Sequence, residues 1–184
     1  MKRFSFATLL VLACALHTCA AANLSAADKA GFKSSFKTTC MQSNSILANA
    51  LEPGEYETMC DCSSDRILAR LATLPQNEAA PLLNADSDEG KKKWAEMGRE
   101  ASMACGAKPF SLAMTRVMMK SCIAGKLSTN DGKPLMMAQR CECISQEFAS
   151  RYTLAAVQAL DNQDAINRLA QQTILISQSA CKPK

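Results

Sequence analysis

The chain has 184 residues, and its 21 lysine and arginine side chains against 17 aspartate and glutamate side chains give a formal net charge of +4. This near balance argues against the strongly basic surface that is typical of nucleic-acid-binding domains. The single histidine, His17, lies in an N-terminal leader, so the rest of the chain offers no imidazole to a catalytic triad or a metal site.

Residues 1–22 predict a secretory signal peptide. Lys2 and Arg3 form a basic start, an apolar run extends from Phe6 to Leu16, and the small residues that a signal peptidase reads end at Ala22. The run is too short to cross a bilayer, which takes about 20 apolar residues. Cleavage near Ala22 would leave 19 basic against 17 acidic side chains. The remaining length, about 160 residues, suits one compact domain or two small units.

Eight cysteines follow the leader, and an even number in an exported chain predicts disulfides rather than free thiols. They are Cys40, Cys60, Cys62, Cys105, Cys122, Cys141, Cys143 and Cys181. We therefore expect an oxidising location, either the periplasm or the outside of the cell. A lipoprotein signal at Cys14 or Cys19 is a weaker alternative, because Leu16 is bulky where such signals carry small residues.

Apolar positions recur with helical spacing, and no stretch of the sequence alternates convincingly between apolar and polar residues. The predicted fold class is therefore all-α. Three helices are expected in the first half, over 25–51, 55–74 and 88–105, with a polar linker over 75–87 that has room for one short helical turn. Ser25 and Asp28 form a capping pattern at the first start, Pro53 ends that helix, and Gly106 ends the third. The expected buried faces hold Phe32, Phe36, Cys40, Leu47 and Leu51, then Ile67, Leu68 and Leu71, then Trp94, Met97, Ala101 and Cys105.

The second half is predicted to repeat this plan. Pro109 suits the first position of a helix that runs up to Gly125, Pro134 opens the next helix, and a last helix runs from about Asp164 toward Cys181. The expected buried faces hold Met114, Val117, Met118 and Cys122, then Met137, Cys141, Ile144, Phe148 and Tyr152, then Ile166, Leu169, Thr173 and Ile176.

The two halves also match residue by residue. A shift of 81 positions superimposes three pairs: Cys60 with Cys141, Cys62 with Cys143, and Pro53 with Pro134. Cysteines, prolines and apolar phase that recur together indicate an internal repeat. We therefore expect a disulfide-stapled helical bundle made of two similar three-helix halves, residues 23–107 and 108–184, which either share one core or form two.

Each half contains one Cys-x-Cys, whose two cysteines point roughly 200° apart on a helix and cannot easily bond to each other. Each cysteine can instead reach a different neighbouring helix, so we expect two bridges per half, worth about 2–4 kcal/mol each. The sets are Cys40 and Cys105 with Cys60 and Cys62, and Cys122 and Cys181 with Cys141 and Cys143. Which member of each pair takes which partner stays open.

Three patterns suggest chemistry, and each has a simpler structural interpretation. Ser34 to Lys37 forms the Ser-x-x-Lys pattern of penicillin-recognising enzymes, but neither a Lys-Thr-Gly motif nor a predicted sheet accompanies it. Four carboxylates cluster near the second helix, yet few aromatic side chains exist to line a sugar cleft. These carboxylates are Glu52, Glu55, Glu57 and Asp61. Methionine and cysteine sulfurs would suit Cu(I), but Met114 and Met118 are one helical turn apart, as core residues are.

No catalytic residue, cofactor or metal site is therefore expected, and no nucleic acid or stable membrane span. We expect a non-enzymatic exported scaffold that binds another exported or envelope protein, in an inhibitor, immunity or accessory role. Two alternatives remain: a carrier that holds an apolar small ligand between the halves, and a soft-metal or thiol-redox protein. The cysteine order differs from that of plant lipid-transfer proteins and saposins, so no family is identified, and the oligomeric state stays open.

Overall fold

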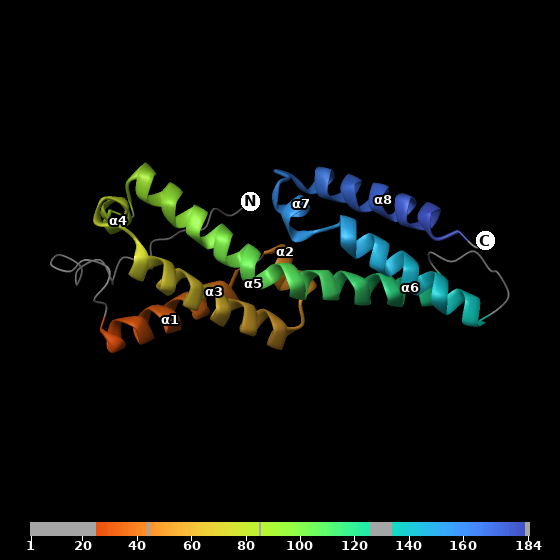
Figure 1. Cartoon of the computed structure of the whole chain (residues 1–184), viewed down its shortest axis with the longest axis horizontal. Helices are drawn as coiled ribbons and strands as arrows, with labels where there is room; N and C mark the ends of the chain where they lie inside the picture. The colour runs from red at the N-terminus through yellow and green to blue at the C-terminus, as the bar shows by residue number, and fades with distance from the viewer. Residues whose placement is uncertain (1–24, 44, 85, 126–133, 183–184) are drawn as a thin grey trace. The chain divides into compact units, whose positions relative to one another are not determined.

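The computed structural model describes residues 25–43, 45–84, 86–125 and 134–182, so the predicted signal peptide lies outside the described residues (Figure 1). These ranges hold eight helices and no β-strand, which confirms the all-α prediction. The helices are α1 (Ala26–Met41), α2 (Ile46–Ala50), α3 (Pro53–Thr73), α4 (Gln76–Leu83), α5 (Asp88–Ile123), α6 (Pro134–Arg151), α7 (Leu154–Gln158) and α8 (Gln163–Ala180).

The helices form two compact units, and each is described by itself. The first unit holds the described chain up to Ala48 and the segment Pro53–Cys105, and therefore α1, α3, α4 and the beginning of α5. The second unit holds Asn49–Glu52 and the chain from Gly106 onward, and therefore the rest of α5 together with α6, α7 and α8.

Helix α1 begins with the predicted cap. The Ser25 hydroxyl accepts a hydrogen bond from the Asp28 amide at 3.1 Å, and the Asp28 carboxylate accepts one from the Ser25 amide at 3.2 Å. The prediction of one helix over 25–51 was wrong, because α1 ends at Met41 and α2 begins at Ile46. The Ser45 hydroxyl accepts from the Ala48 amide at 3.1 Å. A serine that caps a new helix competes with continuation of the old one.

The core of the first unit joins all of its longer helices. Its buried members are Phe32, Ile67, Leu68, Leu82, Met97 and Ala101, with Phe36, Leu71, Leu74 and Trp94 packed against them. Helix α4 occupies most of the segment that was expected to be a linker with room for one short helical turn. Its Leu82 side chain is buried in this core, and the Leu82 carbonyl accepts a hydrogen bond from the Trp94 indole at 3.2 Å. Tertiary burial therefore stabilises a helix that is only eight residues long and carries Pro81 in its interior.

The prediction of a helix boundary at Gly106 and Pro109 was also wrong. Gly106 does not end a helix and Pro109 does not begin one, since α5 runs without interruption for 36 residues. Pro109 costs one backbone hydrogen bond, because it has no N–H to donate to the carbonyl of Cys105. On either side of this point Cys105, Phe110 and Ala113 are buried, and this packing holds the helix together.

In the second unit, α6 and α8 pack along each other. The buried apolar side chains of this unit include Ile144 and Phe148 of α6 and Leu154 and Val157 of α7. The Tyr152 ring stacks on Phe148 and on Phe110, with ring centroids 5.0 and 6.0 Å apart. Sequence reasoning missed α7, which is short and depends on a cap: the Thr153 hydroxyl accepts from the Ala156 amide at 3.2 Å.

Two side chains that were expected inside the second unit lie outside. Val117 is 49% exposed and Ile176 is 47% exposed. On α8 Thr173 is buried as expected, and Ser177 is buried in place of Ile176. The Thr173 hydroxyl donates to the Leu169 carbonyl at 2.7 Å, and the Ser177 hydroxyl donates to the Thr173 carbonyl at 2.8 Å. Burial therefore leaves neither hydroxyl without a hydrogen-bond acceptor. The apolar side chain of Ile176 is turned outward as a result.

Candidate functional site

The eight cysteines form four disulfides, and the pairs stay within the two sets of four. The bridges are Cys40–Cys60, Cys62–Cys105, Cys122–Cys141 and Cys143–Cys181. Their Cα–Cα distances of 5.5 to 5.9 Å lie in the usual range for disulfides. Each Cys-x-Cys thus links its helix to two others: α3 to α1 and α5, and α6 to α5 and the end of α8.

The bridges bear directly on the metal and redox hypotheses. A sulfur in a disulfide is not a thiolate, and only the thiolate is a strong metal ligand or nucleophile. Among the described residues, no group of three or more histidine, cysteine or acidic side chains is placed to hold a metal ion.

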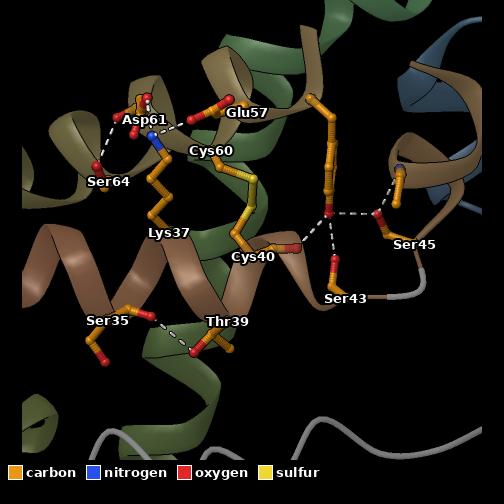
Figure 2. Close-up of a disulfide and its surroundings, with 12 residues drawn as sticks. Ser35, Lys37, Thr39, Cys40, Ser43, Ser45, Glu57, Cys60, Asp61 and Ser64 are labelled. Atoms are coloured by element: carbon orange, nitrogen blue, oxygen red, sulfur yellow. Dashed lines mark hydrogen bonds and ion pairs between the residues drawn. A yellow bond between two sulfur atoms is a disulfide. The ribbon is translucent and has the colours of Figure 1, made fainter. Parts of the chain in front are cut away.

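Two of the four clustered carboxylates, Glu57 and Asp61, pair with a lysine of α1. The Lys37 ammonium lies 2.7 Å from the Glu57 carboxylate and 3.0 Å from that of Asp61, as Figure 2 shows. The hydrogen bonds that Lys37 donates, chiefly to Glu57 and then to Asp61, raise the pKa of Lys37 above its ordinary value. Lys33 pairs with Asp65 one turn farther along α3. The lysine of the Ser-x-x-Lys pattern is therefore explained by its ion pairs between α1 and α3.

A buried tyrosine fixes the turn between α1 and α2. The Tyr56 hydroxyl, which projects from α3, donates to the Cys40 carbonyl at 2.8 Å and lies 2.5 Å from the Ser43 hydroxyl and 3.3 Å from that of Ser45 (Figure 2). This network adjoins the Cys40–Cys60 bridge. Together they anchor the end of α1 to α3, which is a structural role.

A pocket of about 150 Å³ opens between α3 and α5 in the first unit. Its floor consists of core side chains, Ile67, Met97 and Ala101. Its rim carries Arg66 and Arg70, one helical turn apart on α3, with Glu100 of α5. Sequence reasoning did not single out the two arginines. The available signal was a pair of arginines at a spacing of four residues beside the buried Ile67.

Among the described side chains of the second unit, six large apolar ones are exposed: Leu112, Val117, Ile123, Met136, Leu175 and Ile176. Leu175 is 64% exposed and adjoins Ile176 on the outer side of α8. Single exposed apolar residues are common on protein surfaces, whereas contiguous apolar patches mark contact sites.

Comparisons of the chain with protein-family models, with curated proteins and with solved structures find no match. A search of the described helices for one both long and apolar enough to cross a bilayer also finds none.

Proposed function

We propose that this protein is a non-enzymatic exported scaffold that binds another protein of the cell envelope. The observation that carries the proposal is the pair Leu175 and Ile176, large apolar side chains exposed side by side on α8. The end of α8 is bridged to α6 through Cys143–Cys181. A helix held in this way presents its side chains with little loss of conformational entropy on binding, which favours association with a partner.

The cysteine chemistry supports export. Four disulfides in one chain fit an extracytoplasmic location, because the cytosol keeps most thiols reduced. We propose that residues 1–22 are the signal peptide that takes the chain there, with cleavage near Ala22. The alternative of a soft-metal or thiol-redox protein would need free cysteines, and the bridges occupy all eight that follow the predicted leader.

We also propose that the two halves of the chain arose by duplication. The bridges support this, since within each half the first Cys-x-Cys cysteine pairs upstream and the second pairs downstream. The sequence separations are 20 and 43 residues in the first half and 19 and 38 in the second.

Site-specific photo-crosslinking tests the binding function. A photoreactive phenylalanine analogue placed at Leu175 should join the protein to one envelope partner in the source cells, and an excess of the unmodified protein should suppress the product. The same analogue at Gln172, an exposed polar position on α8, is the matched control and should give much less product. Equal labelling from both positions, or none from Leu175, would refute binding through α8.

A further inference from the structure

The α3–α5 pocket offers a site of a different kind in the first unit. We propose that it binds the C-terminal residue of a protein partner, with the carboxylate on Arg66 and Arg70 and an apolar side chain on the floor. This inference rests on the proposed function, because it assumes that the ligand belongs to a protein. It adds the chemistry by which that protein is recognised.

The charge at the rim favours an anion. Two arginines face one carboxylate, that of Glu100, and neither Arg66 nor Arg70 forms an ion pair with a described residue. The lysines of α1 differ, since Lys33 and Lys37 are both paired with carboxylates of α3. Guanidinium groups bind carboxylates through two parallel hydrogen bonds, so a pair of available arginines is well suited to this ligand.

The size of the pocket limits what can enter. Its volume of about 150 Å³ is well below the roughly 300–1,000 Å³ of pockets that enclose a drug-sized ligand. One amino-acid side chain fits, whereas a long lipid chain does not. The floor of Ile67, Met97 and Ala101 favours an apolar side chain. An apolar residue with a free α-carboxylate supplies both contacts, whereas an internal acidic side chain would leave the floor largely uncovered.

The walls of the pocket are braced before any ligand arrives. The Cys62–Cys105 bridge joins α3 to α5, and its Cα atoms lie 5.9 Å apart. Cys62 lies one helical turn before Arg66, and Cys105 lies one turn after Ala101. The bridge therefore fixes the spacing of the two helices at one end of the pocket, and a site formed in advance loses less entropy on binding.

Peptide titration of the full oxidised protein tests this proposal. The probe is acetyl-Gly-Gly-Ser-Ala-Leu with a free C-terminus, and the measurement is the NMR shift of the Ile67, Met97 and Ala101 methyl groups. The free acid should cause saturable shifts at these three residues. The same peptide with an amidated C-terminus should bind at least about tenfold more weakly, because it lacks the charged acceptor.

Substitutions identify the groups that bind. Arg66→Gln and Arg70→Gln should each weaken binding of the free-acid peptide about tenfold. Arg99→Gln, an exposed arginine of α5 that does not line the pocket, should leave binding unchanged. Equal binding of acid and amide, or of a peptide with an internal glutamate, would overturn the proposal, as would tighter binding of octanoate. Crosslinking through Leu175 without peptide binding would refute this site alone, and peptide binding without crosslinking would refute the α8 contact alone.

Discussion

The Tyr56 hydroxyl donates a hydrogen bond to the Cys40 carbonyl at 2.8 Å, across 16 residues of sequence. Cys40 also forms the disulfide with Cys60, one helical turn from Tyr56 on α3. The end of α1 is thus held to α3 twice, by a covalent link and by a buried polar contact. The ring of Tyr56 is itself buried, so this hydrogen bond is shielded from water.

Replacement of Tyr56 by phenylalanine should destabilise the protein by about 1–3 kcal/mol, because buried polar partners then lose a hydrogen bond. Urea unfolding under oxidising conditions measures the change. Ser43→Ala is the control, since it removes only one of the contacts to the tyrosine hydroxyl and should cost less. An equal cost for the two variants would contradict the central role of the Tyr56–Cys40 bond.

Replacement of Gly90 by alanine should also destabilise the first unit, by about 1–3 kcal/mol, as overpacked sites do. A Cβ atom at this position would lie 2.2 Å from the Asn84 carbonyl oxygen and 2.6 Å from that of Pro81. These are backbone atoms, so the turn between α4 and α5 would have to move.

Gly98 provides a matched control on the same helix. Apart from its chain neighbours and the adjacent backbone of α5, no atom lies within 4 Å of the place that a Cβ atom would take. Gly98→Ala should therefore stabilise α5 by about 0.5–1 kcal/mol, since alanine loses less backbone entropy in a helix. Thermal unfolding of the two variants gives the comparison, and a stabilised Gly90→Ala protein would show that the α4–α5 turn is packed differently.

The Lys37 amine should titrate above its ordinary value of 10.5, because the Glu57 and Asp61 carboxylates hold its proton. A pKa that is higher in the folded state gives a stabilising contribution that is complete below the unfolded pKa. That contribution disappears as the pH rises through the folded pKa. NMR titration of the Lys37 side chain measures the shift, which added salt should reduce because the group is exposed. A pKa that stays raised in a Glu57→Gln, Asp61→Asn double variant would assign the shift to another cause.

Periodicity was enough to predict the all-α class and the position of α3, because apolar spacing directly reports which helix face is buried. The Ser25 cap was predicted from a local signal, the capping pattern of Ser25 and Asp28. Local signals failed at Gly106 and Pro109, since the burial of Cys105 before this point and of Phe110 and Ala113 after it outweighs the local preference of the two residues. Helix propensity is a weak prior that tertiary contacts often override.

The binding surfaces were harder to predict than the helices. The outward position of Ile176 depends on Ser177, a polar residue that can be buried only because its hydroxyl reaches the Thr173 carbonyl. The Arg66 and Arg70 rim depends on α5 lying opposite α3, a contact between segments far apart in sequence. Neither arrangement has a signature within one helix, and so neither could be derived from spacing alone.

The purified protein should contain no free thiols among the eight cysteines, and peptide mapping under non-reducing conditions should recover the four links seen here. In the folded protein, the two bridges of the second unit should then be reduced at different rates. Cys122 and Cys141 are both completely buried, whereas Cys143 is partly exposed beside Cys181. A reductant must reach a sulfur atom to attack it, and a buried bridge becomes accessible only when the structure opens.

Cys122–Cys141 should accordingly be reduced at least about tenfold more slowly than Cys143–Cys181 in folded protein. Timed alkylation followed by mass spectrometry gives both rates in one sample. Repeating the reaction in denaturant provides the control, because the two rates should converge once burial no longer protects either sulfur pair. Equal rates in the folded protein would mean that α5 and α6 separate as readily as the end of α8, and the α5–α6 bridge would not lie in a closed core.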